Sequence, residues 1–310
     1  MRVLFHAPWP NADVWLAELR RAGPELELVL WPDVGDPAII DAAVVWQPPP
    51  ELFRDLSSLR CICVLGAGVD HLLALGDAVP PVPVVRLVDP LMAERMAGYV
   101  LAVVLHHQRQ LGLYRRQQEA RVWQRHLHPD TAATRVGILG LGAMGRATAL
   151  LLAKVGYDVA GWSRSARSIA GIRCMAGAGE RDAFLARSDV LVCLLPLTAS
   201  TRGILDRQLL ERLPEGALLI NAARGEHLNE ANLIAALDSG RLGGAVLDVL
   251  AEEPPPPDHA FWHHPKVLMT PHVASLSDPV GGAARMVEAL RAVRDGRAPA
   301  DLVDRADYLA

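Results

Sequence analysis

The sequence predicts an α/β protein built from two doubly wound parallel-sheet units, and three observations support this fold class. The chain has 310 residues, which is too long for one ordinary hydrophobic core and suits two domains. Short apolar runs alternate with helical patterns along the whole chain, as expected when helices cover a parallel sheet. A polar segment, Tyr114–Thr134, is rich in Arg, Gln and His and separates a first unit from a second.

The first unit contains apolar runs of strand length with helical patterns between them. The expected strands are Val3–His6, Leu26–Leu30, Val44–Trp46, Cys61–Leu65 and Val84–Leu87. Helices are expected at Asp13–Arg21, Val69–Leu75 and, as one long helix, at Pro90–Gly112.

The second unit repeats the alternation more regularly. The expected strands are Arg135–Leu139, Asp158–Trp162, Val190–Leu195, Ala217–Asn221, Ala245–Val249 and Val267–Thr270. A helix is expected at Arg146–Val155, and a last helix at Gly282–Asp295 follows the final strand. Its position in the chain suits packing back onto the first unit.

Composition excludes several classes of protein. The net charge of −4 argues against a nucleic-acid-binding protein, which normally carries a basic surface. No run approaches the ~18 apolar residues of a membrane span, and the N-terminus lacks the long apolar region of a signal peptide. The four cysteines lie in apolar stretches, which indicates buried thiols rather than disulfides. We expect a cytoplasmic protein.

A glycine-rich turn, Gly140-Leu141-Gly142-Ala143-Met144-Gly145, follows the first strand of the second unit and opens a helix. This strand–turn–helix context is the one in which a G-x-G-x-x-G motif binds a dinucleotide. Gly140 permits the tight turn, Gly142 lets the backbone approach the pyrophosphate, and Gly145 allows the helix to pack near the strand. The free N–H groups at the helix start then face the phosphates.

The end of the next strand indicates which cofactor is bound. NAD-binding proteins usually carry Asp or Glu there for the ribose hydroxyls, but Ser163 holds this position. Arg164 and Arg167 follow and carry guanidinium groups suited to a 2′-phosphate. We therefore expect NADP as cofactor, with NAD possible, since a solvated basic turn is the alternative interpretation of these residues.

Three polar residues follow three separate strands of the second unit. Arg224 comes just after Ala217–Asn221, Glu253 follows Leu247-Asp248-Val249, and His272 follows Val267–Thr270. The carboxyl ends of parallel strands share one sheet edge, which is where such sheets bind ligands. Reduction of a ketone needs a proton donor, a role for histidine next to a carboxylate, and arginine can bind an anionic substrate. For each residue taken alone, a structural role is the stronger interpretation: an ion-paired arginine, a solvent-facing glutamate or a histidine at a strand end.

These residues and several motifs resemble the D-isomer-specific 2-hydroxyacid dehydrogenases, and more closely their glyoxylate/hydroxypyruvate reductase branch. The matching stretches are Val45-Trp46, Gly66–Asp70, Arg86–Asp89, Gly140–Gly145, Trp162–Ser165, Leu194–Thr198, Asn221–Gly225, Leu247–Val249, Glu252–Pro254 and Thr270–His272. They cover essentially the whole chain in the family's order.

The resemblance implies roles for individual residues. Arg224, Glu253 and His272 are the implied catalytic set, and the Glu-Pro pattern selects Glu253 over Glu252. Asp248 is the implied partner of the nicotinamide carboxamide. Candidate cofactor contacts are Gly140, Gly142, Ala143, Met144, Gly145, Ser163, Arg164, Arg167, Leu195, Pro196, Thr198, Ala222 and Asp248. Candidate substrate contacts are Trp46, Ala67, Gly68 and Arg86, with the glycine-rich loop binding the substrate carboxylate.

The resemblance also implies a domain organisation that the strand pattern alone does not give. Residues 1–100, completed by 276–310, are the expected substrate domain, and residues 101–275 the expected dinucleotide-binding domain of Rossmann type. A cleft between two such domains would exclude water from the reaction. A homodimer through the cofactor domain is implied, with Tyr114–Thr134 contributing and Trp123 as an anchor.

The same fold also serves other functions. A non-catalytic nucleotide-sensing module need not carry all three catalytic residues, and a dehydrogenase for a bulkier acid or with NAD preference would keep the same chemistry. Formate dehydrogenases of this family pair the histidine with glutamine, not glutamate. A metal site is not expected, because the histidine pairs His106-His107, His126 with His128, and His263-His264 have no Cys or carboxylate partners at ligand spacing.

Overall fold

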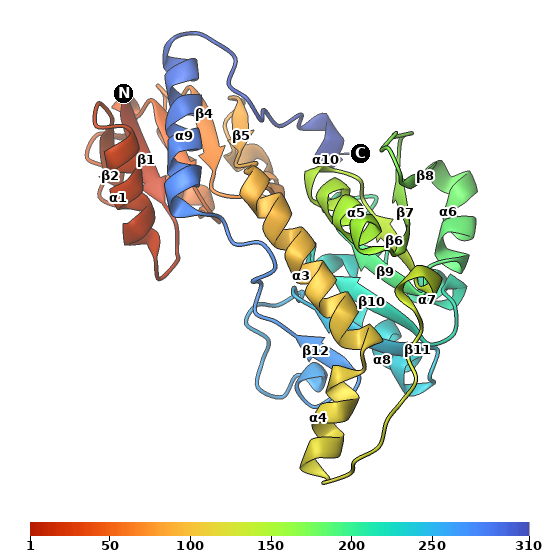
Figure 1. Ribbon diagram of the computed structural model, residues 1–310. Helices are drawn as coiled ribbons and strands as arrows, with labels where there is room; N and C mark the ends of the chain where they lie inside the picture. The colour runs from red at the N-terminus through yellow and green to blue at the C-terminus, as the bar shows by residue number, and fades with distance from the viewer. Residues whose placement is uncertain (310) are drawn as a thin grey trace. The chain divides into compact units, whose positions relative to one another are not determined.

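The computed structural model describes residues 1–309, and the chain divides into two compact units (Figure 1). Unit 1 comprises Met1–Asp89 and Ser277–Ala310, and unit 2 comprises Pro90–Leu276. The first boundary therefore falls at Asp89–Pro90 rather than near residue 100. The physical reason is that helix α3 (Pro90–Gln108) packs along helix α5 (Ala143–Val155), so its whole length belongs to unit 2.

Unit 1 is a five-stranded parallel sheet with the order β2-β1-β3-β4-β5. Its strands are β1 (Arg2–His6), β2 (Glu27–Leu30), β3 (Ala42–Val45), β4 (Cys61–Val64) and β5 (Val84–Arg86). Its helices are α1 (Ala12–Ala22), α2 (Asp70–Leu73), α9 (Pro279–Arg294) and α10 (Ala306–Leu309). Strands β3 and β4 are buried at every residue, which explains their unbroken apolar sequences.

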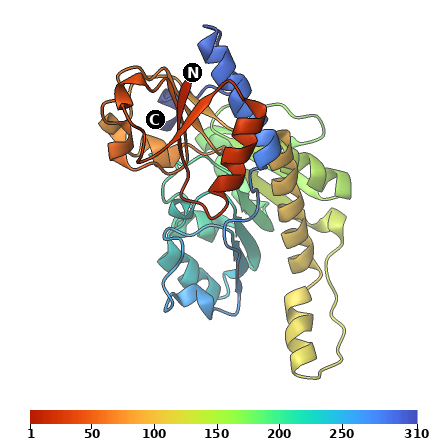
Figure 2. The same ribbon diagram turned by 90° about the vertical axis from the view of Figure 1, so that its left-hand side faces the viewer.

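The last long helix completes unit 1, as the sequence predicted. Helices α1 and α9 lie side by side in both ribbon views (Figures 1 and 2). Gly282 of α9 lies so close to the ring of Trp15 in α1 that a Cβ atom there would be 2.5 Å from the ring. Helices from opposite ends of the chain thus pack together in unit 1.

Unit 2 is a seven-stranded parallel sheet with the order β12-β11-β10-β9-β6-β7-β8. Its strands are β6 (Arg135–Leu139), β7 (Asp158–Ser163), β8 (Arg173–Ala176), β9 (Val190–Cys193), β10 (Ala217–Asn221), β11 (Leu242–Leu247) and β12 (Val267–Met269). Its helices are α3, α4 (Leu111–Glu119), α5, α6 (Gly177–Ala186), α7 (Arg207–Arg212) and α8 (Glu230–Asp238). The chain leaves β6 toward β7 and returns on its other side as β9, so the strand order reverses at β6, where such sheets bind ligands.

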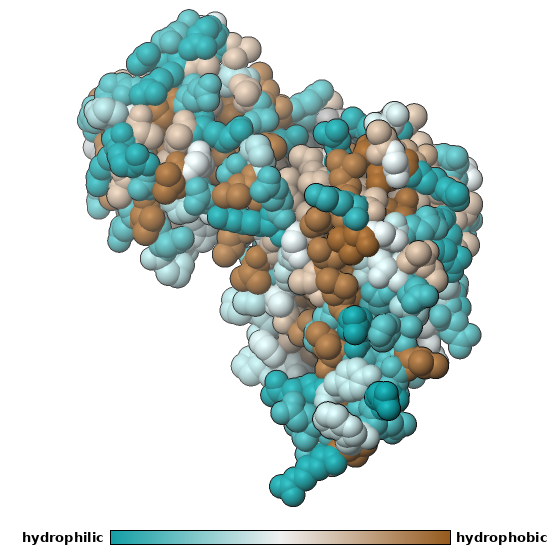
Figure 3. Space-filling view, viewed as in Figure 1, coloured by the Kyte–Doolittle hydropathy of each residue, from teal (hydrophilic) through white to brown (hydrophobic). Residues whose placement is uncertain are grey.

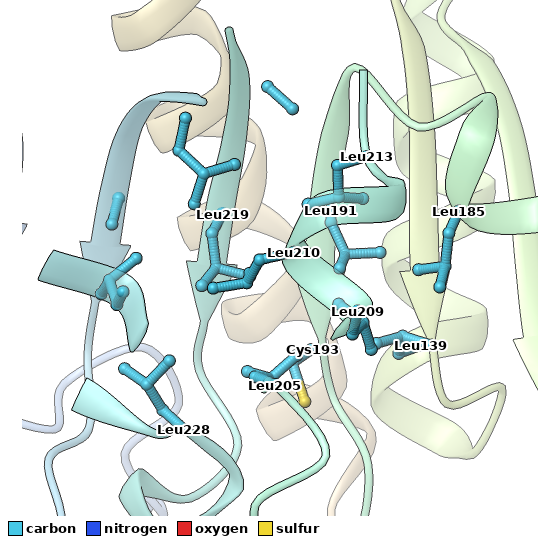
Figure 4. Close-up of a cluster of buried hydrophobic side chains, with 14 of the residues drawn as sticks. Leu139, Leu185, Leu191, Cys193, Leu205, Leu209, Leu210, Leu213, Leu219 and Leu228 are labelled. Atoms are coloured by element: carbon cyan, nitrogen blue, oxygen red, sulfur yellow. The ribbon is translucent and has the colours of Figure 1, made fainter. Parts of the chain in front are cut away.

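Helices cover both faces of this sheet. Helices α3 and α5 pack on one face, where they bury residues such as Ile138, Val192 and Ile220. Helices α6, α7 and α8 pack on the other face, which is rich in leucine (Figure 4). Because alternate residues of a strand point to opposite faces, a strand buried on both sides needs a continuous apolar run. The two doubly wound parallel sheets predicted from the sequence are confirmed.

Strand β8 and helix α4 of unit 2 differ from the sequence prediction. Strand β8 lies at the sheet edge, and its sequence Arg-Cys-Met-Ala is only partly buried, so it lacks the apolar run of a central strand. Helix α4 lies within a segment expected to be one long helix followed by a polar linker. Gln110 adopts a left-handed φ of 55° and separates α3 from α4. None of the described helices is long and apolar enough to cross a membrane.

Candidate active site

The glycine-rich turn lies at the carboxyl end of β6, where the strand order reverses. Gly140 has a φ of 99°, a conformation that favours glycine, and its N–H donates to the Trp162 carbonyl at 2.8 Å. Gly145 lies so close to the strand that a Cβ atom would be 1.8 Å from the Gly140 carbonyl oxygen. Both positions therefore require glycine for the fold itself.

Gly142 differs from its two neighbours in the motif. It is the N-cap of α5 with a φ of −70°, which any residue can adopt, and a Cβ atom there would meet no atom within 4 Å. The protein alone thus gives no reason for glycine at this position. Open space beside the free N–H groups of a helix start fits the approach of a phosphate group, which is the binding mode the motif predicts.

The strand next to β6 ends without a carboxylate. Ser163 is the last residue of β7, and its Oγ donates to the Ser165 carbonyl at 2.8 Å. Asp158 lies at the opposite end of the strand and pairs with Arg187, with 2.5 Å between the nearest N and O atoms. Arg164 and Arg167 follow Ser163 and are exposed. The basic residues predicted to lie beside the adenosine ribose therefore follow the carboxyl end of β7, the end of the sheet at which the glycine-rich turn lies.

The three candidate catalytic residues follow three adjacent strands. Arg224 follows β10, Glu253 follows β11 and His272 follows β12, and these strands are neighbours in the sheet. Gly225, next to Arg224, would place a Cβ atom 1.9 Å from the Leu250 carbonyl carbon, so the Arg224 loop packs directly on the loop that leads to Glu253. The structure therefore brings these three loops to one place.

His272 and Glu253 form a hydrogen-bonded pair. His272 Nδ1 lies 2.9 Å from Glu253 Oε2, and Glu253 Oε1 accepts from the Leu250 N–H at 3.0 Å. Burial tends to raise the pKa of the Glu253 carboxyl, but these two hydrogen bonds and the charges of His272 and Arg224 lower it overall. An ionised Glu253 accepts a hydrogen bond from Nδ1–H, which leaves Nε2 as the ring nitrogen that can exchange a proton with a ligand.

The Arg224 backbone is held by two buried side chains. Asn221, which is fully buried, donates from Nδ2 to the Arg224 carbonyl at 2.9 Å. His227 is also fully buried, with Nδ1 3.2 Å from the Arg224 carbonyl and Nε2 3.2 Å from the Pro196 carbonyl. Sequence reasoning missed the role of His227, because nothing in the chain indicates that residues 196 and 227 meet.

Three of the candidate cofactor residues after β9 and β10 are buried. Leu195, Thr198 and Ala222 are each less than 10% exposed, and the Pro196 carbonyl also accepts from Thr201 Oγ1 at 2.7 Å. Asp248 is only 2% exposed and accepts three hydrogen bonds from the loop that carries His272. Ala143 and Met144 are the first residues of α5.

The candidate substrate residues all belong to unit 1 and follow β3, β4 and β5. Trp46 lies against Gly66, where a Cβ atom would be 2.3 Å from the indole ring, and its ring centre is 4.3 Å from that of His71. Ala67 and Gly68 continue this loop. Arg86 ends β5 and donates to the Tyr308 hydroxyl over 3.4 Å. The structure therefore brings Trp46 to the loop that contains Gly66 and Gly68. Arg86 instead contacts Tyr308 in the C-terminal segment.

No set of three or more His, Cys, Asp or Glu side chains suited to a metal ion occurs within residues 1–309. Two of the histidines named above make contacts with single polar side chains. Gln117 Nε2 lies 2.7 Å from His126 Nε2, and His264 lies 3.3 Å from Asp238.

A reversal of strand order beside a glycine-rich turn, with a histidine–carboxylate pair on the same sheet edge, defines a dinucleotide-binding protein with an acid–base site. Comparison with known proteins gives the family. Residues 101–274 match the family model described as D-isomer specific 2-hydroxyacid dehydrogenase, NAD binding domain. The chain belongs to the D-isomer specific 2-hydroxyacid dehydrogenase family, as its motifs predicted.

The relatives cover almost the whole chain. Glyoxylate/hydroxypyruvate reductase A of Serratia proteamaculans (strain 568) is 40% identical, over 98% of each chain. A D-isomer specific 2-hydroxyacid dehydrogenase from Xanthobacter autotrophicus Py2, solved with NADPH and MES, is 41% identical with a TM-score of 0.93 over 99% of this chain and 98% of that one. The NADPH-dependent glyoxylate/hydroxypyruvate reductase of Sinorhizobium meliloti, solved with NADP and sulfate, is 38% identical with a TM-score of 0.93 over 98% of each chain.

Proposed function

We propose that this protein is an NADPH-dependent reductase that converts a small 2-oxo acid, such as glyoxylate or hydroxypyruvate, to the 2-hydroxy acid. The observation that carries the proposal is the 2.9 Å His272–Glu253 pair, which lies with Arg224 on the same sheet edge as the dinucleotide turn. Reductases of this name at about 40% identity support the substrate class, and a relative solved with NADPH supports the cofactor.

The residues present fit a bound NADPH. The open space at Gly142 and the N–H groups that start α5 would receive the pyrophosphate. Arg164 and Arg167 would pair with the 2′-phosphate, and Ser163 adds no carboxylate to repel it. When bound, the reduced nicotinamide would supply the hydride. The loops that carry Pro196 and Ala222 would form the walls of its site.

The catalytic residues would control charge on the substrate. Arg224 would bind the substrate carboxylate and polarise its carbonyl group. Negative charge that develops on the carbonyl oxygen requires a proton, and His272 would donate it from Nε2. Glu253 would accept a hydrogen bond from Nδ1–H and hold the ring in the orientation that leaves Nε2 for the substrate. Unit 1 would serve as the substrate domain, with the N–H groups of the Ala67–Gly68 loop on the carboxylate and Trp46 and Arg86 as further contacts.

We further infer a homodimer formed through unit 2. Trp123 and Leu127, after α4, are almost fully exposed at 101% and 97%. Figure 2 shows α4 and the following segment extending away from the rest of unit 2, and Figure 3 shows apolar residues gathered over α3 and α5. Exposed apolar surface of this extent marks interaction sites. Light scattering of the wild-type protein and of the Trp123→Ser variant tests this. We expect the mass of a dimer for the wild type and a lower mass for the variant. A wild-type monomer contradicts it.

We also infer a reducing compartment, and the cysteines support this. The structure contains four free cysteines, three of them buried, which suits a reducing environment such as the cytoplasm.

The experiment that tests the function is a spectrophotometric screen of NADPH and NADH oxidation with glyoxylate, hydroxypyruvate, pyruvate and phenylpyruvate. We expect the highest kcat/KM with NADPH together with either glyoxylate or hydroxypyruvate. His272→Ala should abolish turnover and leave the Kd for NADPH nearly unchanged. Turnover with none of these acids, or a clear preference for NADH, contradicts the proposal.

A further inference from the structure

The backbone of His272 adopts a conformation that histidine rarely takes. Its φ is 53°, in the left-handed region that disfavours side chains with a Cβ atom. Its N–H donates to the Asp248 carbonyl at 2.9 Å and to the Thr270 carbonyl at 3.0 Å. Such a conformation persists only where surrounding contacts impose it. The residues that impose it are therefore part of what aims the imidazole ring.

One carboxylate holds the chain on both sides of His272. Asp248 Oδ1 accepts from Thr270 Oγ1 at 2.6 Å and from the Val273 N–H at 2.9 Å, and Oδ2 accepts from the Ala274 N–H at 2.9 Å. Asp248 is 2% exposed, so water competes little for these bonds. Charge-assisted hydrogen bonds of this kind are the stronger ones in proteins.

A tyrosine from a distant helix completes the arrangement. Tyr99 of α3 lies with its hydroxyl 2.6 Å from Thr270 Oγ1. The single hydroxyl proton of Thr270 is used in its hydrogen bond to Asp248. The Thr270 oxygen can therefore only accept a hydrogen bond from Tyr99. Burial raises the pKa of Tyr99 to about 12, so this donor stays protonated at ordinary pH. The directions of both hydrogen bonds are thus fixed: Tyr99 donates to Thr270, and Thr270 donates to Asp248.

We propose that Tyr99 and Thr270 are positioning residues, which act through Asp248 to keep His272 in its left-handed conformation and on Glu253. This inference rests on the proposed catalytic role of His272. Neither side chain needs to touch a ligand. Loss of either would let the His272 loop relax, so that Nε2 is misplaced for proton transfer while the cofactor site keeps its shape.

The expected effects follow from the number of hydrogen bonds removed. Tyr99→Phe removes one and should lower kcat about fivefold, with the KM for NADPH within about twofold of wild type. Thr270→Val removes two and should lower kcat about thirtyfold. Thr270→Ser keeps the hydroxyl and should restore kcat to within about threefold of wild type.

Tyr157→Phe is the matched control. The Tyr157 hydroxyl is buried and donates to Oε1 of Gln108, also in α3, at 2.5 Å. Its loss should lower the Tm about as much as Tyr99→Phe and leave kcat unchanged. A merely structural role for Tyr99 would make the two variants alike in kcat, and that result would overturn the proposal. A raised KM for NADPH at unchanged kcat would overturn it as well.

A readout that does not depend on turnover separates this proposal from the function. In ¹⁵N-labelled protein, the His272 ring signals, assigned with His272→Asn, should show Nδ1 protonated in the wild type and in Thr270→Ser. We expect a mixture of tautomers in Thr270→Val. Identical ring signals in all three proteins would overturn the positioning role, whether or not the wild type reduces a 2-oxo acid.

Discussion

Gly142→Ala separates cofactor binding from folding. In this structure the added methyl group would meet no atom within 4 Å, and the φ of −70° suits alanine. Gly145→Ala is the opposite case, because its methyl group would lie 1.8 Å from the Gly140 carbonyl oxygen. We therefore expect Gly142→Ala to fold normally and Gly145→Ala to be strongly destabilised.

The magnitude for Gly142→Ala can be worked out from two opposing terms. Alanine is a poorer N-cap than glycine, which costs about 1 kcal/mol, and it restricts the unfolded chain, which returns about 0.4–1 kcal/mol. The net change in the free energy of unfolding is below about 1 kcal/mol, or a Tm shift of no more than about 4 °C. If the pyrophosphate approaches here, the methyl group disrupts one charge-assisted hydrogen bond, which contributes about 1.5–3 kcal/mol. The Kd for NADPH should then rise about 10- to 100-fold.

The assay is titration of NADPH by calorimetry, with the Tm measured on the same samples. Gly98→Ala is the control, since a methyl group at this position in α3 also meets no atom within 4 Å. It should leave the Kd unchanged. A folded Gly142→Ala protein whose Kd lies within about twofold of wild type would show that the pyrophosphate does not bind at this turn.

Three further predictions concern the catalytic pair, the cofactor and acid stability. Glu253→Gln keeps the shape but removes the charge 2.9 Å from His272, so kcat should fall at least about tenfold at constant NADPH affinity; unchanged kcat would remove Glu253 from the chemistry. Arg164→Ala with Arg167→Ala should lower kcat/KM for NADPH about 100-fold and leave that for NADH nearly unchanged, whereas equal losses would contradict a 2′-phosphate site. Burial lowers the pKa of three histidines below the ordinary value of 6.5, so the unfolded chain binds more protons than the folded protein. Thermal unfolding should therefore show a Tm that decreases as the pH falls below about 6.5, and a Tm that is constant or increases there would refute this reasoning. These histidines are His6, His107 and His227.

The elements that could be predicted are those whose signal is local. A strand buried on both faces must be continuously apolar, so β4 and β9 were found directly from their sequences. The turn Gly140–Gly145 was found because its backbone demands glycine at fixed spacing. Strand β8 was missed because an edge strand is half exposed, and the break at Gln110 was missed because neither Pro nor Gly marks it.

The same limit applies to the candidate site. Arg224, Glu253 and His272 could be placed on one sheet edge, because each follows a parallel strand. That their strands are neighbours depends on the order β12-β11-β10, which three-dimensional packing sets. The contact of His227 with the Pro196 carbonyl depends on the pairing of β9 with β10, because it joins the loops that follow these two strands.

The sequence by itself determined the alternation of strands and helices, the dinucleotide turn and the residue types of the catalytic set, because each depends on neighbours along the chain. Only the tertiary structure decided the contacts between remote positions. Tyr99 meets Thr270 across 171 residues, and α9 returns to pack on α1. The physical reason is that burial selects residue types locally, whereas hydrogen-bond partners are selected by which strands and helices become adjacent when the two sheets are covered.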